Sequence, residues 1–433
     1  MNTLDTGKHL ISTSPRLRVS HSSVLPIGYR AAGLPRHDRP RPSRHGLAIF
    51  YSDRPATAAA LFTTNRVKSA HILVDQKQLR RGKSQVIMVN SGCANCCTGR
   101  RGIQEAEKTI LWASQALDVE PGRILVASTG VIGDFLPMDL LSEEIPMLSK
   151  RLLGPKGARS GSFHKATEAI LTTDTVAKIA HASVRIRGRE VRIWGCAKGA
   201  GMIHPDMNPS GKPVATSTRH ATMLAFILTD LDMDKRALTA LLARSSDKSF
   251  SRVTVDGDTS TNDTALALAN GAAGVSCRTP RERELFAYAL DQVCIELAKK
   301  MAKDGEGASK FLEIRVDGAR TEADAQKLAM TVATSPLVKT AAYGEDSNWG
   351  RVLAAIGRAG VALDPFKVDI YFGRLCVFRQ GAPTAVSAEK AREPLKAREV
   401  TITIRVHQGS AQGLYWTCDF TGQYVDINAR YRT

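Results

Sequence analysis

Six short segments of this 433-residue chain combine glycine with polar side chains that can take part in chemistry. Such loops commonly carry catalytic and binding residues. None is a phosphate-binding loop, because Gly199-x-Gly201 lacks the glycine spacing and the Lys-Ser/Thr ending of that motif. We find no Ser-His-Asp order, and the histidines show no metal-ligand spacing. Spacing alone therefore indicates an enzyme-like protein of undefined chemistry. The segments are 90–99, 128–134, 198–206, 256–264, 304–308 and 344–350.

The cysteines form one cluster, at Cys93, Cys96 and Cys97. A single Cys-x-x-Cys without a second pair or a nearby histidine is weak evidence for zinc. Small buried thiols are the simpler interpretation, and a chain of this size does not need disulfides. We therefore expect neither a metal nor a cofactor.

The segments that must position these loops mix helix and strand patterns. Apolar runs predict buried strands at 84–89, 124–127 and 223–228, the first two followed directly by glycine-containing turns. Alternation over 184–193 predicts a hairpin, and the prolines of 208–220 indicate an exposed loop. Because strict βαβ alternation is missing, we expect an α/β (α+β) fold of helices layered on antiparallel-rich sheets. Helices are also predicted at 103–117, 234–244, 280–303, 322–332 and 349–358, and strands at 253–255, 368–372, 400–406 and 414–419.

These segments resemble, in order, the motifs of the ornithine acetyltransferase family, the glutamate N-acetyltransferases. Lys198-Gly-Ala-Gly-Met-Ile-His-Pro-Asp-Met207 and Ala221-Thr-Met-Leu-Ala-Phe226 are similar to its cleavage region. One block alone is weak, but the ordered set, from about Gly28 to the last residue, is highly specific. It implies a self-processing fold like that of N-terminal-nucleophile enzymes. The other blocks are 90–99, 127–133, 172–175, 255–263, 304–308, 344–351 and 428–433.

The resemblance implies that Thr222 is the nucleophile. Its hydroxyl would attack the carbonyl of Ala221, and water would split the resulting ester. The freed α-amine, with a pKa of roughly 8, would serve as base for the Thr222 hydroxyl. Thr222 would then take acetyl from N-acetylornithine and pass it to glutamate, in arginine biosynthesis; the sequence leaves open whether acetyl-CoA is also a donor. The expected parts are a basic N-terminus (1–27), an alpha chain (28–221) and a beta chain (222–433).

The remaining site residues also follow from the resemblance. The Thr129 side chain and the Gly130 N–H would form an oxyanion hole, in which one donor contributes on the order of 3 kcal/mol. Lys198 suits a substrate carboxylate or assists near the nucleophile, and Glu306 suits the amino group of ornithine. The expected substrate-binding positions are Thr172, Lys198, Thr222, Glu306, Asn428 and Thr433.

Each of these residues also has a purely structural interpretation. Thr222 precedes an apolar run and has the side chain of a strand residue, and Thr129 could cap a helix. Lys198 and Glu306 stand among glycines, as solvated loop charges do, and Asn428 lies near a terminus, where chains fray. We prefer the family roles because the blocks occur as a complete ordered set.

Two features depart from the family pattern. The segment 208–220 is an insertion directly before the expected cut, and it contains its own Ala215-Thr216. The cut could therefore fall before Thr216, or fail; we predict Thr222, because the apolar run 223–230 fixes it beside a buried strand. Cys93 and Cys96 replace an Asn and an Ala of the family without altering an expected catalytic residue.

Composition limits the partners. The formal net charge is +18, much of it in the first 100 residues, but no nucleic-acid-binding motif accompanies it and aromatic residues make up 6%. No apolar run approaches the roughly 20 residues of a transmembrane helix. The basic N-terminus resembles a transit peptide only weakly and lacks a secretory apolar core. We expect a cytoplasmic enzyme of small molecules, a heterotetramer of two alpha and two beta chains, without nucleic acid or membrane.

Two rival functions remain open. A self-cleaving amidohydrolase or peptidase on the same fold would use water where glutamate accepts the acetyl group, and the insertion beside the cut motivates it. A non-enzymatic nucleic-acid binder, motivated by the charge, would bind DNA in a salt-sensitive manner.

Overall fold

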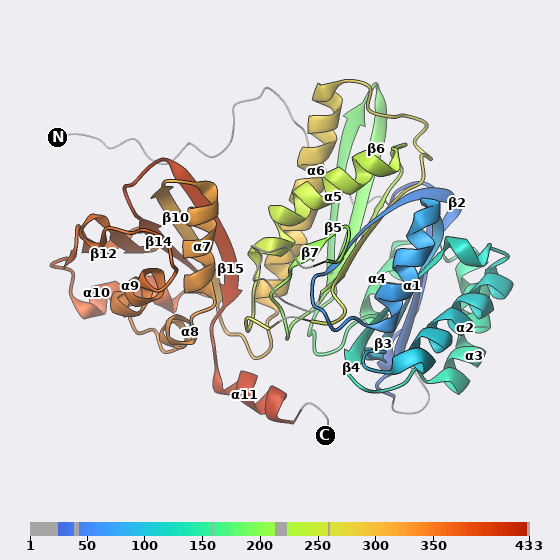
Figure 1. The fold of residues 1–433 in the computed structure, drawn as a ribbon, viewed down its shortest axis with the longest axis horizontal. Helices are drawn as coiled ribbons and strands as arrows, with labels where there is room; N and C mark the ends of the chain where they lie inside the picture. The colour runs from blue at the N-terminus through green and yellow to red at the C-terminus, as the bar shows by residue number, and fades with distance from the viewer. Residues whose placement is uncertain (1–24, 39–42, 158, 213–222, 259, 431–433) are drawn as a thin grey trace.

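The computed structural model describes residues 25–38, 43–157, 159–212, 223–258 and 260–430. Figure 1 shows two lobes: a larger one in blue, green and yellow, and a smaller one in orange and red. The long helix α6 (Pro280–Lys303) ends the larger lobe and leads the chain into the smaller one. After the smaller lobe the chain runs below it as helix α11 (Gly422–Ala429).

The larger lobe is built on one sheet. Its strands among the described residues are β1 (Tyr29–Leu34), β2 (Gly46–Thr63), β3 (Lys83–Cys93), β4 (Ile124–Val131), β5 (Lys178–Ile186), β6 (Arg189–Lys198), β7 (Met207–Asn208), β8 (Leu224–Thr229) and β9 (Thr264–Ala269). The order is β4-β3-β2-β9-β8-β6-β5, with β1 and β7 also paired to β2. Strand β8 therefore lies inside the sheet, antiparallel to β6 and parallel to β9.

Strand β2 folds this sheet over on itself. Its register with β3 shifts between Tyr51 and Ala56, so its first half pairs with β1 and β3 and its second half with β9. The ring of Phe50 lies 5.6 Å from those of Trp194 in β6 and Phe226 in β8. The β1–β4 half therefore packs face to face on the β5, β6, β8, β9 half, with a buried aromatic core between them.

Helices cover both outer faces. Helices α2 (Gly99–Leu117) and α3 (Met138–Leu153) bury their apolar sides against the β1–β4 half, and α5 (Lys235–Asp247) and α6 cover the other half. Helix α6 starts where Thr279 and Glu282 form a capping box around Pro280. The result is four layers, helix, sheet, sheet and helix. Helices α1 (Ala70–Gln78) and α4 (Ser160–Ala169) pack beside β4 and β1.

The smaller lobe packs helices on a second sheet of order β13-β12-β11-β14-β10-β15. The strands of this lobe are β10 (Phe311–Ala319), β11 (Asp369–Phe372), β12 (Leu375–Arg379), β13 (Ala382–Pro383), β14 (Glu399–Arg405) and β15 (Ala411–Cys418), and its helices α7 (Glu322–Ala333), α8 (Pro336–Tyr343), α9 (Trp349–Gly357) and α10 (Ala388–Arg392).

The expected fold class is confirmed. Only β3–β4, β8–β9 and β10–β14 pair in parallel among the described strands, so the sheets are antiparallel-rich. The turns predicted after 84–89 and 124–127 are wrong, because the parallel pairing continues to Gly92 and Gly130. Residues 253–255 form no strand; Val253 makes a single bridge to Trp416. Of the predicted loop 208–220, Asn208 belongs to β7, and 213–220 lie outside the described residues. None of the described helices is long and apolar enough to cross a bilayer.

Candidate active site

A cavity of about 240 Å³ lies where the C-terminal ends of β3, β4 and β6 approach the segments that lead into β9 and leave α6. It brings together all six of the expected site residues that the structure describes. Ala221, Thr222 and Thr433 lie outside the described residues, as does Thr216. The six expected residues that line the cavity are Thr129, Gly130, Thr172, Lys198, Glu306 and Asn428.

The proposed oxyanion pair stands at the end of β4. Thr129 is buried, and Gly130 pairs with Gly92 of β3 at a φ of 134°, a conformation that favours glycine. A Cβ at position 130 would lie 2.3 Å from the Gly92 carbonyl carbon, so only glycine fits. A threonine hydroxyl and a backbone N–H side by side can donate two hydrogen bonds to one oxyanion.

Asn262, for which sequence reasoning predicts no separate role, joins the ends of β3 and β4. Its amide donates 2.7 Å hydrogen bonds to the carbonyls of Ala94, after β3, and Ser128, beside Thr129. Its own side-chain oxygen accepts from the Thr261 hydroxyl at 2.6 Å. Asn262 is buried and lines the cavity, so it fixes the end of β4, which carries Thr129 and Gly130, relative to the end of β3.

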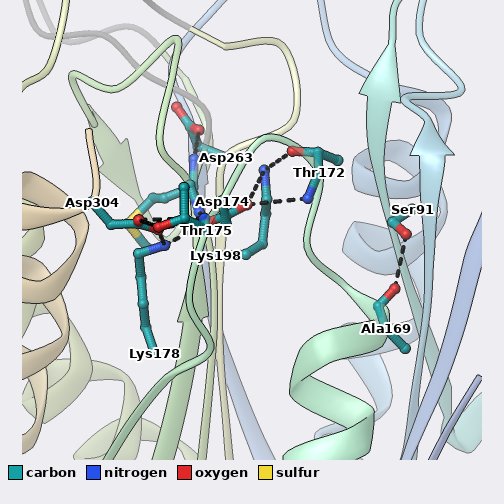
Figure 2. A network of polar contacts seen from close by, with 11 residues as sticks. Ser91, Ala169, Thr172, Asp174, Thr175, Lys178, Lys198, Asp263 and Asp304 are labelled. Carbon is teal, nitrogen blue, oxygen red and sulfur yellow. Dashed lines mark hydrogen bonds and ion pairs between the residues drawn. The ribbon is translucent and has the colours of Figure 1, made fainter. Parts of the chain in front are cut away.

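Lys198, the last residue of β6, is almost completely buried. Figure 2 shows its ammonium directed at Thr172, whose hydroxyl accepts a 2.9 Å hydrogen bond, while the carboxylate of Asp174 is 3.7 Å away. Burial lowers the pKa of Lys198, and the positive Lys178 adds to this; Asp174 works in the opposite direction. Lys198 is therefore a cavity amine that loses its proton more readily than a surface lysine.

Glu306 supplies the negative charge of the cavity. Its backbone N–H donates to the Ala200 carbonyl at 2.8 Å, and its carboxylate accepts a 2.8 Å hydrogen bond from the Asn428 amide. Asn428 comes from α11, so the end of the chain reaches back to the cavity. A cavity lined by both a buried carboxylate and a buried amine suits a ligand that carries both charges.

The described chain resumes at Met223, the residue directly after Thr222. The Met223 N–H donates to the carboxylate of Asp263, and the Met223 carbonyl accepts from the Thr264 N–H at 2.9 Å. The next residue, Leu224, pairs with Lys198. The start of β8 is therefore fixed beside cavity residues.

Sequence reasoning missed further polar residues around this site. Asp174, Asn262 and Asp304 stand inside the quoted blocks, where a polar residue among glycines was the available signal. Lys178 gave no signal, because it begins a strand and its partners come from other segments.

The cysteine cluster is not arranged as a metal site. Cys93 and Cys96 are buried, Cys97 is exposed, and the Cys96 and Cys97 sulfurs are 3.8 Å apart. Among the described residues, no group of three or more His, Cys, Asp or Glu is placed to hold a metal.

The fold is a layered α/β architecture of the kind that carries enzyme active sites, and its cavity holds a buried amine and a buried carboxylate. Comparison with known proteins identifies the family: residues 31–433 match the model of the ArgJ family, and the chain belongs to that family. It is thus an acetyltransferase of arginine biosynthesis.

Its similarity to curated relatives extends over nearly the whole chain. The arginine biosynthesis bifunctional protein ArgJ of Desulfotalea psychrophila is 45% identical over 90% of this chain and 95% of its own length. The protein of the same name from Bacillus subtilis is 39% identical over 98% of this chain and 99% of its own. A solved structure of the Bacillus halodurans protein is 42% identical, with a TM-score of 0.47, over 48% of this chain and 99% of that one.

Proposed function

We propose that this chain cleaves itself between Ala221 and Thr222 and then uses Thr222 to move acetyl from N-acetylornithine to glutamate. The observation that carries this proposal is the single cavity that gathers Thr129, Gly130 and Lys198 next to the start of β8. Thr222 directly precedes the anchored Met223.

The chemistry is two acyl transfers through one ester. The Thr222 oxygen attacks the acetyl carbonyl, and the negative oxygen of the tetrahedral intermediate accepts hydrogen bonds from Thr129 and Gly130. The carbon–nitrogen bond to ornithine then breaks, and the leaving amine takes the proton that the Thr222 α-amine had removed from the hydroxyl. Glutamate reverses these steps: its amine attacks the ester, loses a proton, and returns Thr222 to its free form.

The charges of the cavity suit both amino acids. Glu306, held by Asn428, would bind the amino group of ornithine. Lys198 and Thr172, already hydrogen-bonded to each other, would meet a substrate carboxylate or the reacting groups. Thr433 completes this proposed set.

The position of β8 supports the expectation that the two fragments stay together. Strand β8 would belong to the fragment 222–433 but is hydrogen-bonded over its whole length to β6 of the fragment 28–221. We also propose a heterotetramer of two alpha and two beta chains, a cytoplasmic location and, as a second donor, acetyl-CoA.

The deciding experiment is intact mass under denaturing conditions for the wild-type protein and Thr222→Ala. We expect two wild-type fragments that meet at Ala221/Thr222, and one uncut variant chain. A cut before Thr216 would move the nucleophile there, and an uncut wild-type chain that is active would refute self-cleavage as a requirement. Hydrolysis of N-acetylornithine at a rate that glutamate does not change would favour the amidohydrolase instead.

A further inference from the structure

A second buried lysine stands behind the cavity without lining it. The side chain of Lys178, the first residue of β5, has no exposed surface. Its ammonium donates to Asp174 at 2.6 Å and to Asp304 at 2.5 Å, as Figure 2 shows. A buried ammonium with two carboxylates at such distances is strongly held in its charged form.

Both Lys178 and Lys198 form ion pairs with Asp174, and the pair with Lys198 is the longer of the two. Its nitrogen is 3.7 Å from the Asp174 carboxylate, and its short contact is with the neutral hydroxyl of Thr172. The Asp174 carboxylate also accepts two hydrogen bonds from backbone N–H groups, from Gly199 at 2.6 Å and from Thr172 at 3.1 Å. Asp174 is thus occupied by Lys178 and two N–H groups, and Lys198 approaches its carboxylate only to 3.7 Å.

Burial and most of the surrounding charges act on the pKa of Lys198 in opposite directions, and burial prevails. Burial lowers its pKa most; the negative charges that oppose this are Asp174, Glu306 and Asp263, and the positive charge that adds to it is Lys178. For Lys178 burial is outweighed by Asp174 and Asp304, which raise its pKa. Of the two lysines near Asp174, Lys178 therefore has the raised pKa and Lys198 the lowered one.

The same network joins the segments that carry the binding residues. Asp304 accepts a hydrogen bond from the Thr175 N–H at 3.1 Å and stands two residues before Glu306. Asp174 links Thr172 to Gly199, the neighbour of Lys198. Displacing Lys178 would therefore disturb three walls of the cavity at once.

We propose that Lys178 is a positioning residue that occupies Asp174 and Asp304, so that Lys198 faces the cavity as an amine able to accept and return a proton instead of as half of a fixed ion pair. The use of that proton in acetyl transfer rests on the proposed function. The charge state of Lys198 does not, and it can be measured without substrate.

The first test uses the unsubstituted protein. Trace labelling with deuterated acetic anhydride across pH, read by peptide mass spectrometry, gives the midpoint at which each lysine becomes reactive. We expect Lys198 to reach its midpoint at least about one pH unit below the exposed Lys367, a shift of the size that burial and neighbouring charge produce. Equal midpoints for Lys198 and Lys367 would overturn the proposal.

The second test removes Lys178 with a compensating change. The double variant Lys178→Met/Asp304→Asn deletes one cation and one anion and leaves Asp174 to Lys198. We expect the Lys198 midpoint to rise by about one pH unit or more, as a close opposite charge requires, and the acid limb of acetyl transfer to move the same way. A midpoint that stays where it was would refute the role of Lys178.

A matched control is the ion pair between Lys248, at the end of α5, and Asp291 in α6. Lys248→Met/Asp291→Asn removes a 2.7 Å ion pair with a buried aspartate, roughly 20 Å along α6 from Asp304. This control should leave the Lys198 midpoint unchanged. Because labelling needs no turnover, a failure of self-cleavage or transfer would count against the proposed function and leave this result intact. The first test needs no substitution, so it decides the proposal even if the double variant does not fold.

Discussion

Gly201 lies directly against Glu306: a methyl group at position 201 would stand 2.1 Å from the Glu306 Oε2 atom. The carboxylate therefore occupies the space that any other residue at 201 would fill. Because the contact is with the end of a flexible side chain, a larger residue would displace the carboxylate and not the backbone.

Gly201→Ala should therefore weaken substrate binding while the fold persists. Moving the Glu306 carboxylate breaks its hydrogen bond with Asn428, and a hydrogen bond to a charged group contributes about 1.5–3 kcal/mol. We expect the KM for N-acetylornithine to rise about tenfold or more, with little change in melting temperature. Gly161→Ala is the control, since nothing lies within 4 Å of that position. An unaltered KM in Gly201→Ala would argue against a binding role for Glu306.

Thr129→Val should slow the chemistry with little effect on folding. Valine keeps the shape of the side chain but removes its hydroxyl, and the loss of one oxyanion donor lowers kcat by about 10²–10³-fold. Self-cleavage, followed by intact mass over time, should slow as well, because it passes through the same kind of intermediate. Thr129→Ser retains the hydroxyl and should keep most of the activity. Equal rates in the valine and serine variants would exclude Thr129 as an oxyanion donor.

Asn262→Asp should destabilise the protein and lower kcat together. A carboxylate at this buried position would face the carbonyl oxygens of Ala94 and Ser128 in place of an amide that donates to both. Two buried acceptors left without donors cost about 2–4 kcal/mol in free energy of unfolding, measurable by chemical denaturation. Asn208→Asp changes an exposed amide that donates to the Lys212 carbonyl, and it should have little effect.

Acid should weaken the fold through His71. Burial lowers its pKa to about 3, while its ring contacts the hydroxyls of Ser69 and Thr264. The pKa of His71 in the unfolded chain is about 6.5. Below that pH the unfolded chain binds a proton at His71 that the folded chain does not bind. The free energy of unfolding is therefore highest above pH 6.5 and decreases as the pH falls. Between pH 7.5 and 5.0 this group should remove about 2 kcal/mol.

The measurement is the free energy of unfolding at both pH values for the wild-type protein and His71→Asn. The difference in free energy of unfolding between the wild-type protein and His71→Asn should be smaller by about 2 kcal/mol at pH 5.0 than at pH 7.5. The exposed His37, replaced in the same way, serves as the control. A difference that does not depend on pH would show that His71 is protonated in the folded state.

Local signals predicted the regular elements well. Helix α6 has the bounds that its helical pattern and the stop at Asp304-Gly305 predict, and the structure adds a capping box of Thr279 and Glu282 at its start. The turns predicted at 90–92 and 128–130 are wrong, because these residues belong to β3 and β4, and their glycines permit close strand pairing. The bend in β2 depends on which strands its two halves meet, and an alanine-rich run of 18 residues does not reveal that.

The candidate site likewise contains residues that sequence motifs predict and contacts that they do not. Family motifs pointed to Thr129, Gly130, Lys198 and Glu306, which all line one cavity. The contacts that support them join segments far apart in the chain, such as Asn262 and Ala94, 168 residues distant. No local pattern encodes such a contact.

The position of β8 between β6 and β9 also explains why one gene should encode both parts of the protein as a single chain. Its six residues fill a slot between β6 and β9, so a protein assembled from two separately translated pieces would need one piece to insert a strand into the middle of the other's sheet. Under the proposed self-cleavage, a single open reading frame avoids that problem, because the sheet can close while the chain is still intact. Fragments purified apart after denaturation should recombine poorly for the same reason.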